Sequence, residues 1–134
     1  MHHYVRDWMK APISVVDPDS SVPYALTLMR RRGIHSLVVD LTAENRGYGI
    51  LTSTDIRDKI IANEQNPAET QVRDIMTAPV ITASPDWTLI QCSQTMQSHN
   101  FHHLPVADDA GNIVGMISAT DLFTAAEEIG WEGS

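Results

Sequence analysis

Two aspartates stand in nearly the same sequence surroundings and have the right chemistry to bind a polar ligand. Asp55 closes the segment Gly49–Asp55 and Asp121 closes Gly115–Asp121, each with a Thr or Ser three residues earlier. A carboxylate can accept hydrogen bonds from both hydroxyls of a cis-diol such as a ribose. The same spacing is a helix capping box, so a structural role is the alternative for both aspartates.

Basic side chains offer two candidate contacts to phosphate. His35, His102 and His103 are weaker phosphate partners than arginine, whose planar fork binds phosphate through two hydrogen bonds. Histidine gains charge as the pH falls below neutrality, so phosphate binding through these residues should tighten at lower pH. The run Arg30–Arg32 is the second candidate, but three consecutive residues on a helix point in different directions and favour a solvated face.

The remaining reactive side chains give no catalytic or metal-binding pattern. His99, His102 and His103 have metal-ligand spacing only if a helix continues past Asn100, where a turn is expected, so no metal site is predicted. Cys92 lies on an apolar helical face and is predicted to be a core residue. Without a nucleophile–base pair, paired acids or a glycine-rich phosphate loop, the sequence indicates a protein that is not an enzyme.

The charge distribution restricts the partners. The chain has 134 residues and a net charge of −8. All nine Lys and Arg fall in residues 1–73 with nine acids, whereas residues 74–134 hold eight acids and no Lys or Arg. Such a surface disfavours nucleic acid. No apolar run approaches the roughly 20 residues of a membrane span, and a single cysteine excludes an internal disulfide, so we expect a cytoplasmic protein without membrane contact.

A tandem repeat organises the chain. Val5–Pro12 (VRDWMKAP) returns as Val72–Pro79 (VRDIMTAP) at an offset of 67 residues. The pattern His-x-Leu-x-Val at His35 recurs at His102, and the segments ending at the two aspartates match at an offset of 66. Two copies of the same unit are therefore predicted, over residues 1–66 and 67–134.

Each copy predicts the order β-α-β-β-α after a short helical turn. Proline, N-cap residues, Gly33 and apolar spacing set the boundaries. In the first copy the expected elements are a turn at Val5–Met9, strands at Ile13–Val16, Leu37–Val39 and Tyr48–Thr52, a helix ending near Arg32 and a helix beginning near Thr54. In the second copy they are strands at Val80–Thr82, Leu104–Ala107 and Ile113–Ile117, and helices at Trp87–His99 and Thr120–Ile129. Residues 63–70 are the expected linker, and Gly130–Ser134, with Trp131 as a candidate partner contact, the expected frayed tail.

The predicted fold class is therefore α/β, an α+β sandwich of two repeats related by a pseudo-twofold axis. A unit of about 60 residues buries only about 60% of its chain surface, which is marginal for stability. Two copies that cover each other's sheets would form one fused module.

The repeated motifs resemble those of the cystathionine-β-synthase (CBS) domain family over residues 4 to about 128. The resemblance rests on V-R-D-x-M-x-x-P, on His-x-Leu-(Val/Pro)-Val and on the Gly-to-Asp segments, each present twice in the same order. A tandem pair of this kind is similar to a Bateman module. The resemblance implies a non-catalytic regulatory unit that binds AMP, ADP, ATP or S-adenosylmethionine between its repeats and forms a homodimer through its helices to signal to an effector protein.

The resemblance also selects candidate nucleotide-binding residues, which fall into three groups. Asp55 and Asp121 would bind ribose, and hydroxyls and histidines would surround the polar end of the ligand. Apolar side chains and one threonine from the first strands would line the base. Besides the two aspartates, the candidates are Thr52, Thr54, Ser118, Thr120, Thr82, Ile13, Val15, Val80, Ile81, His35, His102 and His103.

Two departures from the family pattern shape the expectations. Members often place His-Arg before the Leu-Pro-Val strand, where this chain has His35-Ser36 and His102-His103. This disfavours a triphosphate and favours AMP, ADP or a phosphate-free adenosyl ligand. A cleft that combines Thr82 with Asp55 is the first candidate for occupancy, because Asp55 lies among basic residues. The alternatives are a small enzyme and an interaction scaffold with unoccupied sites. The scaffold would dimerise through apolar helix positions, namely Ile56, Ile60, Ile61, Leu122, Phe123 and Ala126.

Overall fold

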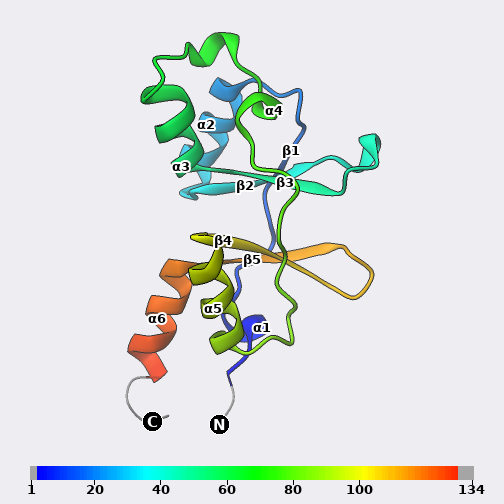
Figure 1. The fold of residues 1–134 in the computed structure, drawn as a ribbon, viewed down its shortest axis with the longest axis vertical. Coiled ribbons are helices and arrows are strands. Elements are labelled where there is room, and N and C mark those ends of the chain that lie inside the picture. Colours follow the sequence, from blue (N-terminus) through cyan, green and yellow to red (C-terminus); the bar gives the residue numbers. More distant parts are fainter. Residues whose placement is uncertain (1–2, 130–134) are drawn as a thin grey trace. The chain divides into compact units, whose positions relative to one another are not determined.

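The computed structural model describes residues 3–129, which belong to two compact units (Figure 1). Residues 14–80 form the first, called here the Asp55 unit. Residues 3–13 and 81–129 form the second, called here the Asp121 unit. Each unit therefore combines the body of one sequence repeat with the first residues of the other. No helix within residues 3–129 is long and apolar enough to cross a membrane.

The Asp55 unit is built on a three-stranded sheet in the order β1-β2-β3. Strand β1 pairs parallel with β2, and β2 pairs antiparallel with β3. Its elements are β1 (Val15–Val16), α2 (Val22–Arg32), β2 (Ser36–Asp40), the 3₁₀ turn η1 (Thr42–Glu44), β3 (Tyr48–Thr52), α3 (Ser53–Asp55), η2 (Ile56–Ile61), the 3₁₀ turn η3 (Pro67–Glu69) and α4 (Val72–Ile75). Helix α3 continues directly into η2, whose winding is that of a π-helix.

Local sequence explains the boundaries of α2. The Ser21 side chain accepts a hydrogen bond from the Tyr24 amide, and a proline stands in the first turn. Gly33 ends the helix with φ 62°, a left-handed conformation that glycine adopts at little cost. Val22, Ala25 and Met29 are buried on one face, where they join a core with Leu37, Val39 and Leu51 of the sheet.

The Asp121 unit contains a two-stranded antiparallel sheet with three helices. Its elements are α1 (Val5–Trp8), α5 (Leu89–His99), β4 (His103–Ala107), β5 (Ile113–Ser118) and α6 (Ala119–Ile129). Thr88 and Gln91 form a capping box at the start of α5, and Asn100 ends it with φ 54°. Cys92 is fully buried with Leu104 and Val106, which confirms its predicted core position.

Several predicted boundaries were wrong. The strand expected at Val80–Thr82 does not form, because the chain contacts β4 only through an isolated bridge between Ala83 and Val106. Strand β1 is shorter than the expected Ile13–Val16, and α5 begins after its Thr88 cap rather than at Trp87. The tail Gly130–Ser134, with Trp131, lies outside the described residues.

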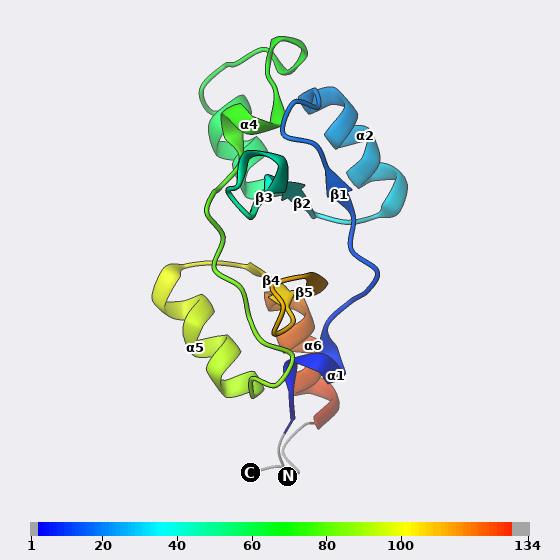
Figure 2. The same ribbon diagram turned by 90° about the vertical axis from the view of Figure 1, so that its right-hand side faces the viewer.

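The repeated segments Val5–Pro12 and Val72–Pro79, called here the arms, dock on the opposite repeat (Figure 2). In the Asp121 unit, the Val5 amide donates to the Trp87 carbonyl at 2.9 Å and the Arg6 amide to that of Pro85 at 3.0 Å. In the Asp55 unit, the Val72 amide donates to the Ser20 carbonyl at 2.9 Å. Val5 and Val72 are fully buried, so each arm contributes a side chain to the other repeat's core.

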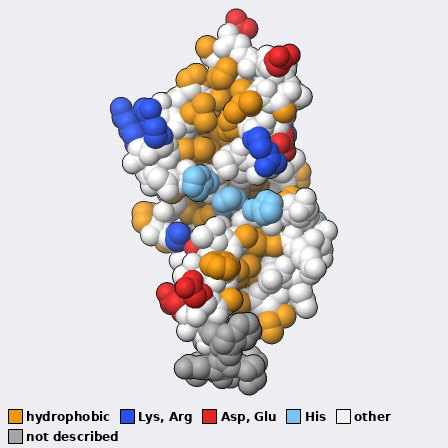
Figure 3. All heavy atoms as spheres, turned by 90° about the vertical axis from the view of Figure 1, so that its left-hand side faces the viewer, with side chains coloured by type: hydrophobic (Ala, Val, Ile, Leu, Met, Phe, Trp, Pro, Cys, Tyr) orange, Lys and Arg blue, Asp and Glu red, His pale blue; other side chains and the backbone are white. Residues whose placement is uncertain are grey.

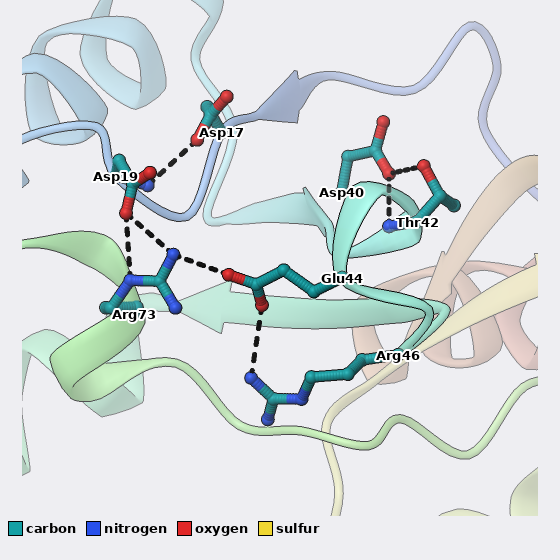
Figure 4. Close-up of polar contacts among 7 residues, drawn as sticks. All are labelled: Asp17, Asp19, Asp40, Thr42, Glu44, Arg46 and Arg73. Carbon is teal, nitrogen blue, oxygen red and sulfur yellow. Dashed lines mark hydrogen bonds and ion pairs between the residues drawn. The ribbon is translucent and has the colours of Figure 1, made fainter.

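Charged residues add a second layer to arm docking. Arg73 forms ion pairs with Asp19 at 2.6 Å and with Glu44 at 2.7 Å (Figure 4), and Arg6 pairs with Asp86 at 2.8 Å. The guanidinium of Arg73 lowers the pKa of Glu44. Surface pairs of this kind contribute little to stability, because solvent screens them.

Each arm also packs a methionine against the glycine that opens the Gly-to-Asp segment. A Cβ at Gly115 would lie 2.7 Å from Met9 Sδ and 3.1 Å from the Lys10 carbonyl oxygen. At Gly49 the corresponding contacts are 3.2 Å to Met76 Sδ and 3.2 Å to the Thr77 carbonyl oxygen. The absence of a side chain at these glycines allows the arm backbone to lie against β3 or β5.

Substituting Gly115→Ala should destabilise the protein by about 1–3 kcal/mol, because the arm must move away from β5. Urea unfolding measures the loss. Adding Met9→Ala should recover part of it, since the sulfur is the nearest obstacle. Equal stability of wild type and Gly115→Ala would contradict this account of arm docking.

Burial raises the pKa of the Cys92 thiol to about 11. The thiol is therefore neutral in the folded state at pH values where an unfolded cysteine ionises, above about 8.5. The stabilisation that the neutral Cys92 thiol contributes should be complete below that pH and should be lost as the pH rises toward 11.

A thiol reagent at pH 8 should label Cys92 only at the rate at which the protein unfolds. Immediate labelling of the native protein would contradict the burial, and Cys92→Ala should flatten the alkaline part of the stability profile.

Candidate functional site

Asp55 lies at the junction of β3 and α3, where its carboxylate closes a capping box. Its Oδ2 accepts from the Thr52 amide at 2.9 Å and from the Thr52 hydroxyl at 3.1 Å. The Thr52 hydroxyl in turn accepts from the Asp55 amide at 3.3 Å. These bonds hold the carboxylate of Asp55, whose side chain is 8% exposed, at the end of the sheet.

Asp121 repeats this geometry at the junction of β5 and α6. Its Oδ2 accepts from the Ser118 amide at 2.8 Å and from the Ser118 hydroxyl at 2.9 Å, and its own amide donates back to that hydroxyl at 3.2 Å. The Asp121 side chain is 7% exposed. The structural alternative, capping, is therefore confirmed for both aspartates, and it engages one oxygen of each carboxylate.

The second oxygen, Oδ1, has a lysine partner in both units. Lys59 Nζ lies 3.0 Å from Asp55 Oδ1, and Lys10 Nζ lies 3.2 Å from Asp121 Oδ1. The Thr77 hydroxyl also donates to Asp55 Oδ1, at 3.2 Å. Each buried negative charge is thus compensated by an ammonium group, as burial of a carboxylate requires.

The two lysines come from different places in the repeat. Lys59 follows Asp55 by four residues, and its counterpart after Asp121 is Ala125. Lys10 lies on an arm, and its counterpart on the other arm is Thr77. None of the three was among the candidate binding residues, although Lys59 was one of the basic residues expected around Asp55. The i, i+4 spacing could have indicated Lys59, whereas Lys10 and Thr77 depend on the docking of the arms.

The histidine motif lies beside the same junctions because the paired strands are antiparallel. Ser36 pairs with Thr52, and His103 pairs with Ser118. The His35 carbonyl accepts from the Ser53 amide at 3.0 Å, and the His102 carbonyl accepts from the Ala119 amide at 2.8 Å. His35 and His102 are themselves exposed. Each unit therefore brings histidine main chain, a hydroxyl and an aspartate together at one sheet end.

The other candidates divide between the two units. Val15, Val80, His35, Thr52 and Thr54 belong with Asp55, whereas Ile13, Ile81, Thr82, His102, His103, Ser118 and Thr120 belong with Asp121. Thr82 and Asp55 thus lie in different units, and their shared cleft stays a prediction. The proposed base-lining role of the apolar residues also stays a prediction.

The remaining basic and metal-like patterns have local explanations. Arg30, Arg31 and Arg32 are exposed in the last turn of α2, where cations interact favourably with the helix dipole, and Arg32 donates to the Ser14 hydroxyl at 2.7 Å. Helix α5 ends at His99, whose ring stacks on Phe101. Within residues 3–129, no group of three or more His, Cys, Asp or Glu side chains is arranged to hold a metal ion.

Comparison with known proteins decides the family. The family model described as "CBS domain" matches residues 5–62 and 72–128, which is most of the chain. The chain belongs to the CBS domain family. The two matches fall on the two sequence repeats, so the protein is a tandem CBS pair with the architecture of a Bateman module.

Solved CBS pairs share this fold. A putative signal-transduction protein with CBS domains from Burkholderia ambifaria is 30% identical, with a TM-score of 0.84 and 96% of each chain covered. The CBS domain pair of protein MJ0100, solved with 5′-methylthioadenosine and S-adenosyl-L-methionine, is 25% identical, with a TM-score of 0.82 and coverage of 96% of this chain and 98% of that one.

Among curated relatives, the homoserine O-acetyltransferase of Methanosphaerula palustris is 33% identical over 121 residues, which cover 90% of this chain and 24% of the relative. The chain spans about half or less of the first curated relatives that it matches. Some relatives are thus larger enzymes that contain a comparable CBS region.

Substituting Asp121→Ala should lower the free energy of unfolding by about 1–3 kcal/mol without any ligand, because the Ser118 amide and the neighbouring hydroxyl lose their acceptor. Asp109→Ala, in the exposed turn between β4 and β5, is the matched control and should change stability by less than about 0.5 kcal/mol. Equal effects of the two substitutions in urea unfolding would show that the capping bonds carry little stability.

Proposed function

We propose that this CBS pair is a non-catalytic regulatory module that binds an adenosine-containing ligand at the ends of β3 and β5. The observation that carries the proposal is the duplicated junction, where a buried aspartate lies beside a hydroxyl and the main chain of a histidine. A ribose diol can donate to the carboxylate in place of the ammonium group that now contacts Oδ1. Both Asp55 and Asp121 are candidate ribose partners.

The known complex of protein MJ0100 supports an adenosyl ligand. That pair, which this chain matches over nearly its whole length, was solved with 5′-methylthioadenosine and S-adenosyl-L-methionine. Thr52, Thr54, Ser118 and Thr120 supply hydroxyls next to the proposed ribose positions. Ile13, Val15, Val80, Ile81 and Thr82 are the proposed lining for the base.

The basic side chains near the proposed site limit how many phosphate groups the ligand carries. His35, His102 and His103 would contact phosphate without the bidentate fork of an arginine. AMP, ADP and phosphate-free adenosyl compounds are therefore favoured over ATP.

A homodimer formed through the helices would transmit the signal to an effector protein. Helices α5 and α6 border an open apolar groove of about 650 Å³, with Ile90 and Phe123 each 70% exposed. Figure 3 shows hydrophobic side chains gathered mainly over the Asp55 unit, with smaller groups over the Asp121 unit. Ile56 and Ile60 are buried in their own unit's core, so the expectation that they contact a second copy was wrong. Ile61, from the same predicted set, is exposed.

Ligand binding would act on such a dimer only through unequal affinity for two dimer shapes. The exposed apolar groove also favours the second candidate, a dimerisation scaffold without a ligand. This alternative needs the helical faces but not free carboxylates, and both carboxylates already have lysine partners.

Titration calorimetry with AMP, ADP, ATP and S-adenosylmethionine tests the proposal. The wild type should bind AMP or ADP more tightly than ATP. The double variant Asp55→Asn/Asp121→Asn keeps an acceptor oxygen at each position and should bind at least tenfold more weakly, because the charged acceptor for the diol is lost.

The outcomes separate the two candidates. Absence of heat and of a thermal shift at millimolar ligand, with self-association retained in sedimentation, would reject the sensor and favour the scaffold.

A further inference from the structure

The two lysine–aspartate pairs differ in how firmly the lysine is held. Lys59 lies on the helical segment that follows Asp55, and its ammonium group donates to the Ile75 carbonyl at 2.9 Å as well as contacting Asp55. This carbonyl belongs to α4, which is itself part of the docked arm. Lys59 therefore links the helix to the arm and has a structural partner that no ligand needs to replace.

The main chain of Lys10 is fixed by hydrogen bonds, whereas its side chain extends into solvent. Its amide donates to the Met116 carbonyl at 2.8 Å, and its carbonyl accepts from the Met116 amide at 2.9 Å. Its side chain is 76% exposed, and the ion pair with Asp121 Oδ1 is the contact that the described residues give its ammonium group. The ammonium can thus leave Oδ1 at low cost, since solvent already covers most of the side chain.

The position of the Lys10 ammonium group determines which 5′ substituent of the ligand is favoured. Once a ribose diol occupies the Asp121 carboxylate, the displaced ammonium stays tethered beside the ribose. A 5′-phosphate on that ribose offers it a new anionic partner, and the nearby N-terminus of α6 also favours an anion. A neutral 5′-hydroxyl offers no such partner, and without Lys10 the aspartate would repel a phosphate.

We infer that Lys10 is the specificity-determining residue that makes the Asp121 site select a nucleoside monophosphate over the corresponding nucleoside. The Asp55 site lacks this selectivity, because Thr77 stands at the equivalent arm position and Lys59 is retained by the Ile75 carbonyl. The inference rests on the proposed function, since it assigns the ligand's charged group to one of the two proposed ribose positions.

The test compares the affinities for AMP and adenosine by calorimetry in an Asp55→Asn background, which reports the Asp121 site alone. The variant Lys10→Thr places on this arm the residue found on the other, where the Thr77 hydroxyl donates to the aspartate at 3.2 Å. Asp121 thus keeps a hydrogen-bond partner, and unfolding in urea checks that stability is retained. Lys10→Arg, which keeps the charge, is the conservative control.

The parent and Lys10→Arg should prefer AMP over adenosine, and Lys10→Thr should lose about tenfold or more of that preference while its affinity for adenosine stays equal or increases. Equal loss of affinity for both ligands, or an unchanged ratio, would overturn the inference. Binding of adenosine without any preference for AMP in the parent would also overturn it and leave the proposed function intact. Failure of wild type to bind either ligand would reject the proposed function, and the inference with it.

Discussion

The docking of each arm on the opposite repeat is the constraint on which the rest of the structure depends. Val5 and Val72 fill the core of the unit that the other repeat forms, and their amides bond to its loops. Neither repeat is a complete compact unit without this exchange. A segment of about 60 residues has little core of its own, so a buried valine from the other copy is a substantial addition.

Arm docking also completes the candidate site. The glycine that lets the arm lie against β5 is the first residue of the segment that ends in Asp121, and Lys10 follows directly after the methionine in contact with that glycine. In the other unit, Thr77 reaches Asp55 for the same reason. The V-R-D-x-M motif of the arms and the Gly-to-Asp segment occur together in both repeats because, in each unit, the arm packs against that segment.

Much of this arrangement could be predicted from the sequence, because the repeat aligns residues that act alike. The duplicated Ser/Thr-x-x-Asp spacing predicted both strand–helix junctions, and the cap and glycine signals predicted α2. The strand expected at Val80–Thr82 had the right composition but forms no ladder, since strand pairing depends on neighbours that local sequence does not specify. The π-helical winding after Asp55 could not be predicted from apolar periodicity either, because Ile56 and Ile60 have the spacing of an ordinary α-helix.

The charge pattern along the chain gave a wrong expectation for the surroundings of Asp121, because it too takes no account of contacts between distant segments. Residues 74–134 carry no Lys or Arg, which made the surroundings of Asp121 look purely acidic. The arm brings Lys10 and Arg6 into that unit from the other end of the chain. Local net charge therefore describes a site only after the exchange of segments is known.

The most direct test of the central claim is a crystal structure of the protein grown with AMP. We expect the ribose hydroxyls to lie within hydrogen-bond distance of the carboxylate oxygens of Asp121 or Asp55, with the lysine moved off Oδ1. A bound AMP whose ribose contacts neither carboxylate, with both lysine pairs intact, would contradict the account.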